Sequence, residues 1–258
     1  MRIKALLLDV DGVLTQGNAA VPGAPAALQA LVERGVPFRL VTNSTQRSRA
    51  TLAQRLRSFG FSVDPAMIFS PAVAAARYLT EQGKTAYLAT REDAGADFRE
   101  LGVALDDQHP NAIVLGDLGE DLTYAELNRV LRFLLGGAEL IALGGTLYWH
   151  AADGPALDVG PFTALFEHAT GVKARTLGKP DPAIFAEAAR ALGVATRELA
   201  MVGDDAGVDV AAAKRAGLGF GVLVQTGKYR PGDESRQIPA PDAVYPSFPS
   251  FVGAFLEH

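Results

Sequence analysis

ALLLDVDGVLTQG, residues 5–17, begins as a buried β-strand and ends in two carboxylates. Ala5–Leu8 are apolar without alternation, which is typical of a strand buried on both faces of a parallel sheet. Asp9 and Asp11 follow, and residues two apart on an extended chain point the same way. Two neighbouring carboxylates repel each other, so both stay ionised only beside a cation, and hard oxygen ligands suit Mg²⁺. For this motif alone, a capping pair of acids at a strand–loop junction is an equal alternative.

Short apolar runs alternate with longer amphipathic segments along most of the chain. Strands are expected at residues 3–10, 36–44, 66–71, 84–90, 111–117 and 139–145. Helices are expected at residues 22–35, 45–60, 72–83, 97–102, 123–137, 160–171 and 248–258, and residues 182–227 continue in the same pattern. This order predicts an α/β fold whose parallel sheet carries helices on both faces. Residues 228–243, rich in proline, glycine and charge, are expected to form a loop.

Composition limits the function classes. The chain has 258 residues, of which 48% are hydrophobic and 21% charged, as expected for a globular protein with a sizeable core. The formal net charge of −5 argues against broad binding of nucleic acid or anionic membranes. The chain contains no cysteine, which excludes thiolate metal sites and a cysteine nucleophile. The first apolar run is too short for a signal peptide or a membrane span, so a cytoplasmic location is expected.

A second strand end carries small polar donors. In open α/β sheets, ligands bind at the carboxyl ends of the strands. The run VPFRLVTNS ends in Thr42, Asn43 and Ser44, whose donors before a helix N-terminus suit an anion pocket. For this motif alone, an ordinary helix N-cap is the simpler explanation.

Two later motifs add a cation and three acids. Lys179 in LGKPDP is held between a glycine and a proline at a helix entrance, where it can neutralise a phosphate or a carboxylate. A solvated surface lysine is the alternative for this residue alone. AMVGDDAGVDV ends another apolar strand and provides Asp204, Asp205 and Asp209. Helix capping explains one or two of these acids, but not readily all three.

Together, the four motifs resemble those of the haloacid dehalogenase (HAD) superfamily of phosphoryl-transfer enzymes. The correspondences with its four motifs are, in order, Asp9-x-Asp11-Gly12, Thr42 with Asn43, Lys179, and Asp204 through Asp209. The runs DVGPF, GKPDP, VGDD and TGKYRPGDE resemble more narrowly the NagD-type, class IIA branch. Within that branch, the closest likeness is to HDHD2-like proteins and to the phospholysine phosphohistidine inorganic pyrophosphate phosphatases.

Spacing indicates where a second domain is inserted. About thirty residues separate motifs one and two, which leaves room for a helix and a strand but not for a domain. Roughly 136 residues separate motifs two and three, and much of that length is domain-sized. We therefore expect a Rossmann-like HAD core, discontinuous over residues 1–78 and 176–258, with an α/β C2-type cap at residues 79–175.

The resemblance implies a Mg²⁺-dependent phosphatase that works through an aspartyl-phosphate. Asp9 is then the nucleophile. Asp11 is the general acid and base, protonating the leaving oxygen and then activating water. The implied metal ligands are Asp9, the main-chain carbonyl of Asp11, and Asp204. Either Asp205 or Asp209 would bind through water or orient these ligands.

Substrate contacts come from both expected domains. The implied phosphate-binding residues are Thr42, Asn43, Ser44 and Lys179. Asp158 matches a family stretch that faces the active site, and it is a candidate for contact with the substrate. Trp149 and His150 could stack on or hydrogen-bond a ligand, although structural packing or a surface position is the simpler explanation. The expected substrate is a small phosphorylated metabolite, and a homodimer through the cap is expected.

Three other functions compete with a phosphatase. A phosphotransferase or phosphomutase would use the same aspartyl-phosphate, but superfamily mutases usually carry a smaller cap between the first two motifs, where there is no room here. A non-catalytic regulatory protein on this fold is disfavoured by the intact set of motifs. A generic nucleotide-binding module is disfavoured because neither glycine-rich phosphate motif follows a strand.

Overall fold

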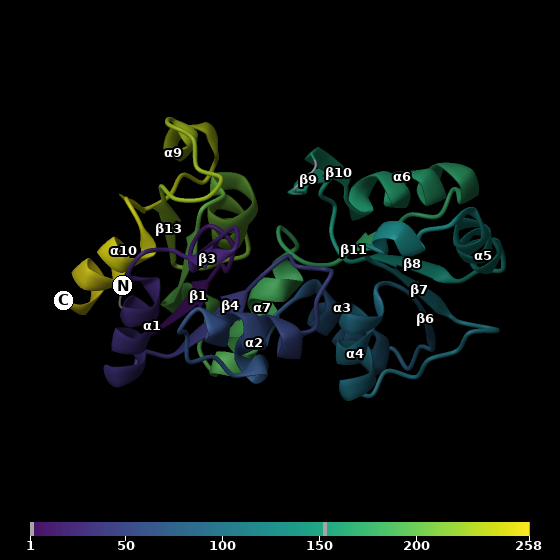
Figure 1. Ribbon diagram of the computed structural model, residues 1–258, viewed down its shortest axis with the longest axis horizontal. Coiled ribbons are helices and arrows are strands. Elements are labelled where there is room, and N and C mark those ends of the chain that lie inside the picture. Colours follow the sequence, from purple (N-terminus) through teal and green to yellow (C-terminus); the bar gives the residue numbers. More distant parts are fainter. Residues whose placement is uncertain (1–2, 152–153, 258) are drawn as a thin grey trace. The chain divides into compact units, whose positions relative to one another are not determined.

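The computed structural model describes residues 3–151 and 154–257, which form two compact units (Figure 1). The first unit contains the chain up to Thr42, Leu52–Phe69, and the chain from Lys179 onward. The second unit contains Asn43–Thr51 and Ser70–Gly178. Among the described residues, no helix has the length and apolar character needed to cross a membrane.

A parallel sheet of six strands forms the centre of the first unit, in the order β14-β13-β12-β1-β4-β5. Its strands are β1 (Ala5–Leu8), β4 (Phe38–Val41), β5 (Ile68–Phe69), β12 (Leu199–Gly203), β13 (Phe220–Val224) and β14 (Ala243–Tyr245). The chain runs outward from β1 in one direction through β4 and β5, and in the other through β12 to β14. The strand order therefore reverses between β1 and β12, where open α/β sheets bind their ligands.

Helices and a small hairpin complete the first unit. The helices are α1 (Ala24–Glu33), α7 (Pro182–Leu192), α8 (Ala212–Arg215), α9 (Asp233–Arg236) and α10 (Phe248–Leu256), with short helical segments η1 (Pro65–Met67), η3 (Thr196–Glu198) and the π-helical η4 (Ala206–Ala211). The hairpin pairs β2 (Thr15–Gln16) with β3 (Ala19–Ala20). α2 (Arg49–Ser58) begins in residues of the second unit and ends in residues of the first.

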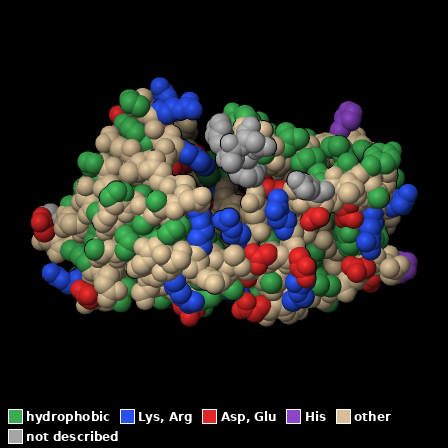
Figure 2. Space-filling view, viewed as in Figure 1, with side chains coloured by type: hydrophobic (Ala, Val, Ile, Leu, Met, Phe, Trp, Pro, Cys, Tyr) green, Lys and Arg blue, Asp and Glu red, His purple; other side chains and the backbone are tan. Residues whose placement is uncertain are grey.

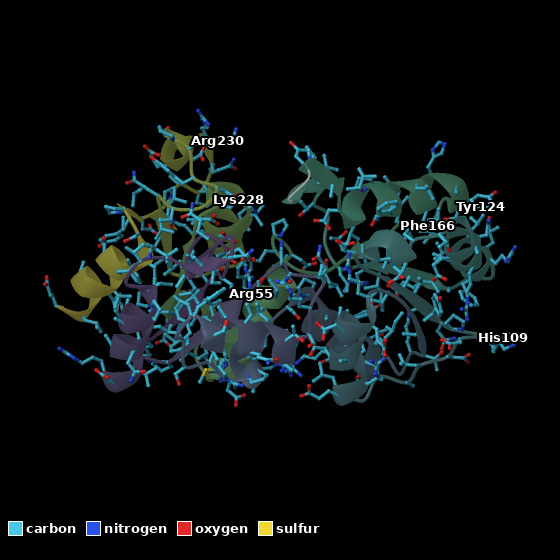
Figure 3. All side chains as sticks on the ribbon, viewed as in Figure 1. Arg55, His109, Tyr124, Phe166, Lys228 and Arg230 are labelled. Carbon is cyan, nitrogen blue, oxygen red and sulfur yellow. The ribbon has the colours of Figure 1, made fainter. Side chains whose placement is uncertain are left out.

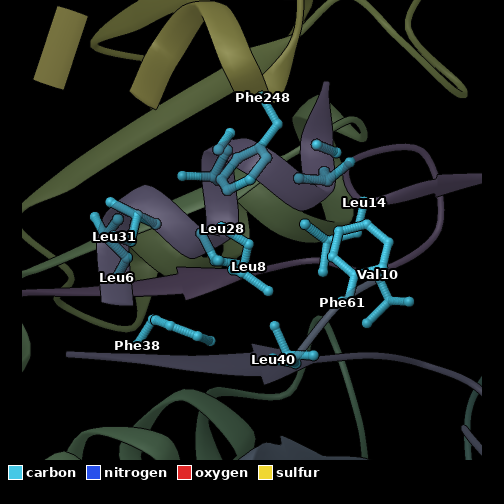
Figure 4. Packing of buried hydrophobic residues seen from close by; sticks show 14 of the residues in the cluster. Leu6, Leu8, Val10, Leu14, Leu28, Leu31, Phe38, Leu40, Phe61 and Phe248 are labelled. Carbon is cyan, nitrogen blue, oxygen red and sulfur yellow. The ribbon is translucent and has the colours of Figure 1, made fainter. Parts of the chain in front are cut away.

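The unbroken apolar run of β1 has its explanation in the packing on its two faces. Leu6 and Leu8 join a buried cluster with Leu28 of α1 and Phe248 of α10 (Figure 4). Leu7, also fully buried, points to the opposite face because side chains alternate along a strand. Fully burying a leucine side chain contributes about 1.5–3 kcal/mol. No position of β1 is left for a polar residue until Asp9, beyond the strand.

The second unit has its own parallel sheet, in the order β11-β8-β7-β6. Its elements are α3 (Pro71–Glu81), β6 (Ala86–Ala89), α4 (Glu92–Glu100), β7 (Ala112–Leu115), η2 (Gly119–Asp121), α5 (Tyr124–Leu135), β8 (Glu139–Ala142), β9 (Tyr148–Ala151), β10 (Gly154–Leu157), α6 (Val159–Thr170) and β11 (Arg175–Thr176). Charged side chains of both signs are mixed on the face of this unit seen at the right of Figure 2. That face therefore presents no broad field of one sign.

Two buried clusters cover the two faces of this second sheet. Ala112 and Val114 of β7 pack in a cluster with residues of α3 and α4. Ile113 and Leu115 pack in a second cluster with residues of α5 and α6. The period of two along β7 thus divides the apolar side chains between two helical layers. The prediction of parallel sheets with helices on both faces is confirmed for both units.

Sequence analysis did not foresee the antiparallel pairs. β2 pairs with β3, and β9 pairs with β10. The first two strands are each two residues long, and β10 alternates between intermediate and exposed positions. Such short or half-exposed strands leave no apolar run in the sequence.

The structural units differ from the predicted domain segments in three places: at α3, at residues 43–51, and at residues 176–178, which end the second unit. α3 belongs to the second unit, because its buried face packs in one cluster with β6 and β7. Residues 43–51 also belong to the second unit. A strand–helix pattern on both sides of a boundary gives no sign of where the packing changes. The predicted cap limits of residues 79–175 and core segments 1–78 and 176–258 stay a prediction.

Candidate active site

Four buried polar residues lie together in the first unit, at the end of the sheet where β1 and β12 finish. They are Asp9, Lys179, Asp204 and Asp209, with exposed fractions of 7%, 4%, 2% and 2%. Because β1 and β12 are hydrogen-bonded neighbours, the residues that follow them meet at one edge of the sheet. The Lys179 ammonium lies 2.6 Å from Asp9 Oδ1 and 2.7 Å from Asp209 Oδ1. Three of the four predicted motifs therefore converge.

The three carboxylates have the geometry of a cation site. One oxygen from each of Asp9, Asp204 and Asp209 lies within 4.8 Å of the others. Asp204 Oδ1 is buried and has no hydrogen-bond partner among the described residues. An unpartnered buried carboxylate oxygen is costly, and a cation removes that cost. The all-oxygen donor set, with one orphaned oxygen, fits a hard divalent ion.

Electrostatics support the same conclusion. Burial raises the pKa of Asp9 well above its usual value, and the carboxylates of Asp209 and Asp204 add to this, although Lys179 opposes it. Burial, followed by the Asp209 charge, raises the pKa of Asp204 to about 6. Burial disfavours the Lys179 charge, but Asp209 and Asp9 outweigh this and raise the Lys179 pKa. The cluster thus holds more negative charge than its lysine neutralises, and a bound cation would restore the ordinary ionised state of the acids.

Glycines allow these carboxylates to approach the backbone. A Cβ built on Gly12, whose φ is +92°, would lie 2.0 Å from Asp204 Oδ2. A Cβ built on Gly203 would lie 2.3 Å from the Cβ of Asp209. Any larger residue at either position would displace one of the clustered acids. The glycines of the first and fourth motifs are thus part of the site.

Asp205 and Asp209, the two alternatives for supporting the metal ligands, have different positions. The Asp205 carboxylate accepts from the backbone N–H groups of Gly207 and Val208, both at 2.9 Å, and so caps η4. The Asp209 carboxylate faces the cluster, where Oδ1 meets Lys179, and its Oδ2 accepts from the Asp205 N–H at 3.2 Å. π-Helical turns are frequent at functional sites. The geometry places Asp209, and not Asp205, among the clustered carboxylates.

Asp11 lies in a different environment from Asp9. It is exposed, and its Oδ1 accepts from the Thr15 hydroxyl at 3.1 Å. The turn that carries it is closed by a hydrogen bond of 2.6 Å from the Gly12 N–H to the Thr15 carbonyl. The first motif therefore presents one buried, ion-paired carboxylate and one accessible carboxylate.

The second motif bridges the two units along the chain. Thr42 is 2% exposed, and its N–H donates to the Phe69 carbonyl at 3.0 Å. Asn43 and Ser44 follow it and are grouped with the second unit. Asn43 Oδ1 lies 3.1 Å from a Cβ built on Gly178, the residue before Lys179. The phosphate-binding roles of these residues stay predictions.

Three aspartates hold the segment of residues 43–51 within the second unit. Asp117 accepts from a glutamine amide of the segment at 2.6 Å, and Asp93 accepts from a serine N–H and hydroxyl at 3.0 and 2.9 Å. Asp97, 1% exposed, accepts from the N–H and the guanidinium of Arg49, at 3.1 and 3.2 Å. These contacts explain why the segment belongs to the second unit although it follows β4.

The remaining predicted residues lie in the second unit. Asp158 is the N-cap of α6, where its carboxylate accepts from the Val159 N–H at 2.8 Å. Its predicted role in substrate contact is untested. Trp149 and His150 belong to β9, but their side chains lie outside the described residues.

One component of the site, the loop that follows β13, was not predicted from the sequence. The Thr226 hydroxyl donates to the Gly12 carbonyl, and the Lys228 N–H donates to Asp204 Oδ2 at 2.6 Å. Between them, Gly227 packs against Asp204. The available signal was the position of Thr-Gly shortly after the apolar run FGVLV, in the strand next to β12.

Comparison with known proteins shows similarity over the whole chain. Residues 6–104 match the family model of haloacid dehalogenase-like hydrolases, and residues 176–251 match a HAD-hydrolase-like model. The chain is 42% identical to haloacid dehalogenase-like hydrolase domain-containing protein 2 from Bos taurus, covering 99% of this chain and 97% of that protein. It is 34% identical to phospholysine phosphohistidine inorganic pyrophosphate phosphatase from Homo sapiens, covering 99% and 95%.

Solved structures share the fold as well. A p-nitrophenyl phosphatase from Archaeoglobus fulgidus superposes with a TM-score of 0.90 at 29% identity, covering 98% of this chain and 100% of that one. NagD from E. coli K-12 superposes with a TM-score of 0.88 at 29% identity, covering 96% and 98%. The predicted fold class, with a second α/β domain inserted between motifs two and three, is confirmed by these neighbours.

Proposed function

The chain belongs to the haloacid dehalogenase-like hydrolases and is a phosphatase, and we propose that it hydrolyses phosphate monoesters through an aspartyl-phosphate on Asp9, with Mg²⁺ as cofactor. The observation that carries this proposal is the contrast within the first motif. Asp9 is buried and paired with Lys179 beside two further carboxylates, whereas Asp11 is accessible. A nucleophile and a proton-transfer group need these two environments.

The metal would be held by Asp9, Asp204 and the main-chain carbonyl of Asp11, with Asp209 beside them. The unpartnered Asp204 Oδ1 and the three clustered carboxylates support this assignment. When bound, Mg²⁺ neutralises charge on the carboxylates and on the substrate phosphate. The few protein ligands suit Mg²⁺, which usually keeps several of its waters.

Two chemical steps follow from the residues. In the first, an Asp9 carboxylate oxygen attacks phosphorus, the bond from phosphorus to the leaving oxygen breaks, and Asp11 gives that oxygen a proton. In the second, Asp11 takes a proton from water, the water oxygen attacks phosphorus, and the bond to Asp9 breaks to release inorganic phosphate. Lys179 holds Asp9 in place through the contact of 2.6 Å, and its charge favours the ionised form of Asp9. Thr42, with the amide and hydroxyl that follow it, would bind phosphate oxygens.

The substrate class is a small phosphorylated metabolite. Relatives are named for p-nitrophenyl phosphate and for phospholysine, phosphohistidine and inorganic pyrophosphate. A panel that releases phosphate from oxygen–phosphorus, nitrogen–phosphorus and pyrophosphate bonds would separate these leaving groups. A homodimer through the second unit and a cytoplasmic location are further predictions, the first checked by light scattering.

The experiment that tests the mechanism compares two variants. Asp9→Asn should abolish phosphate release while circular dichroism and melting temperature show a folded protein. Asp11→Asn should release phosphate slowly and retain a phosphoryl group on Asp9, seen by mass spectrometry of the intact protein. General acid–base groups contribute about 10²–10⁴-fold, which sets the expected loss for Asp11→Asn. Normal turnover by Asp9→Asn, or activity indifferent to a chelator, would overturn the proposal.

A further inference from the structure

We propose that the loop of residues 225–228, after β13, is a positioning element that fixes the orientation of the Asp204 carboxylate toward the metal. The inference rests on the proposed function, because it assumes a cation at the clustered carboxylates. None of the three carboxylates that form the cluster belongs to the loop. Its effect comes from the backbone and from one hydroxyl.

The two oxygens of Asp204 have opposite surroundings. Oδ2 accepts a hydrogen bond of 2.6 Å from the Lys228 N–H. Oδ1 is buried without a hydrogen-bond partner among the described residues. Charge-assisted hydrogen bonds to a carboxylate are short and about twice as strong as neutral ones. The amide therefore fixes the rotation of the carboxylate and leaves Oδ1 as the oxygen free to bind the cation.

Close packing prevents the carboxylate from moving out of this orientation. A Cβ on Gly12 and a Cβ on Gly227 would each lie 2.0 Å from Asp204 Oδ2. The same Cβ on Gly227 would lie 2.5 Å from the Gly12 Cα, so the two glycine backbones confine Oδ2 closely. Any residue other than glycine at position 227 would force the Asp204 carboxylate or the loop to shift.

The loop also holds the backbone of the first motif. The Thr226 hydroxyl donates to the carbonyl of Gly12, the residue next to Asp11. The Asp11 carbonyl is an implied metal ligand, so one short loop orients two ligands from separate strands. Partners of this kind typically change metal affinity by about 10–100-fold.

The Lys228 side chain is separable from the Lys228 amide. Lys228 is exposed, and its side chain extends from the segment between β13 and α9, as does that of Arg230 (Figure 3). Substitution of the side chain alone therefore leaves the N–H in place. Replacement by proline removes the N–H itself.

The test measures Mg²⁺ affinity by calorimetry and by the Mg²⁺-dependent rise in melting temperature, on the full chain. Lys228→Pro should weaken Mg²⁺ binding about 10–100-fold, whereas Lys228→Ala should stay within about threefold of wild type. Thr226→Val should weaken binding in the same direction, and Thr226→Ser, which keeps the hydroxyl, should restore it. Saturating Mg²⁺ should recover kcat in the weakened variants.

Each result decides the inference. If Lys228→Pro is folded and binds Mg²⁺ like wild type, or if Lys228→Ala loses as much as Lys228→Pro, the amide does not position Asp204. If Lys228→Pro does not fold, the comparison of Thr226→Val with Thr226→Ser decides, and equal affinities overturn the inference. If wild type itself shows no Mg²⁺ binding, the proposed function fails and the inference with it. Mg²⁺-dependent wild type with unaffected variants refutes the inference alone.

Discussion

A single methyl group on Gly227 should disturb the candidate metal site more than the same change at Gly35. Its Cβ would lie 2.0 Å from Asp204 Oδ2, far inside van der Waals contact, so the carboxylate or the loop has to move. Gly35 is a matched control. Its φ is +66° against +63° at Gly227, and a Cβ built on it meets nothing within 4 Å. Both substitutions therefore carry the same cost for an alanine at positive φ. The difference in stability between Gly227→Ala and Gly35→Ala measures the effect of the steric clash with Asp204.

The expected magnitudes follow from three contributions. An L-residue in the left-handed region costs about 1–2 kcal/mol, which is the whole effect expected for Gly35→Ala. Gly227→Ala adds overpacking, about 1–3 kcal/mol. It also disturbs the Lys228–Asp204 hydrogen bond, and hydrogen bonds to charged groups contribute about 1.5–3 kcal/mol. The free energy of unfolding should fall by at least about 3 kcal/mol for Gly227→Ala.

Two assays separate the variants. Urea unfolding in the presence of chelator gives the loss of stability, and phosphate release against Mg²⁺ concentration gives the half-saturating Mg²⁺. Gly35→Ala should leave the half-saturation unchanged, and Gly227→Ala should raise it about 10–100-fold. Equal destabilisation of the two variants, with equal response to Mg²⁺, would refute the reasoning that the loop confines Asp204.

Three further predictions concern the charges of the cluster. Lys179→Met removes a buried ammonium from between two carboxylates, which should cost about 3–5 kcal/mol in urea unfolding. The loss should be smaller at about pH 5 than at about pH 8, because protonation relieves the carboxylate repulsion; equal losses would contradict this. The pKa of Asp204 rises from 3.8 to about 6 on folding, so metal-free folded protein binds this proton more tightly than unfolded protein does. Its stabilising contribution is therefore complete below pH 3.8 and is lost as pH rises through about 6, and the stability of wild type relative to Asp204→Asn, in chelator, should fall over that window. A rise of this relative stability with pH would contradict a raised pKa of Asp204 in the folded protein. Asp205→Ala should cost about 1 kcal/mol through loss of the helix cap, without changing half-saturating Mg²⁺. Asp209→Ala should raise the half-saturating Mg²⁺ concentration. A larger rise for Asp205→Ala than for Asp209→Ala would contradict the placement of Asp209 in the metal site.

The sequence was sufficient for the main acids and the lysine of the candidate site. Asp9, Lys179 and Asp204 each follow or precede a strongly patterned element, and parallel strands bring their carboxyl ends to one edge of a sheet. Their convergence could therefore be predicted from the sequence alone. The two-layer covering of each sheet was predictable for a similar reason, because β1 and β7 have no polar position.

Other parts of the site could not be predicted, because they depend on the backbone and not on the type of the side chain. The donor to Asp204 is the Lys228 N–H, and every residue except proline carries one. The choice between Asp205 and Asp209 depends on a π-helical turn, which changes which carboxylate faces the cluster without any sign in the spacing of the acids. Gly227 was the residue that could have indicated this loop in the sequence, but a glycine after a strand also occurs in ordinary turns.

The assignment of residues 43–51 to the second unit has a consequence for exchanging this unit between relatives. A graft limited to residues 70–178 would separate Asp97 from its Arg49 partner and leave a carboxylate of 1% exposure facing a foreign segment. Breaking a buried pair in this way costs about 3–5 kcal/mol, a large share of the stability of an ordinary domain. The transplantable module is therefore a pair of segments, and a chimera should take the short one from the same parent as the long one.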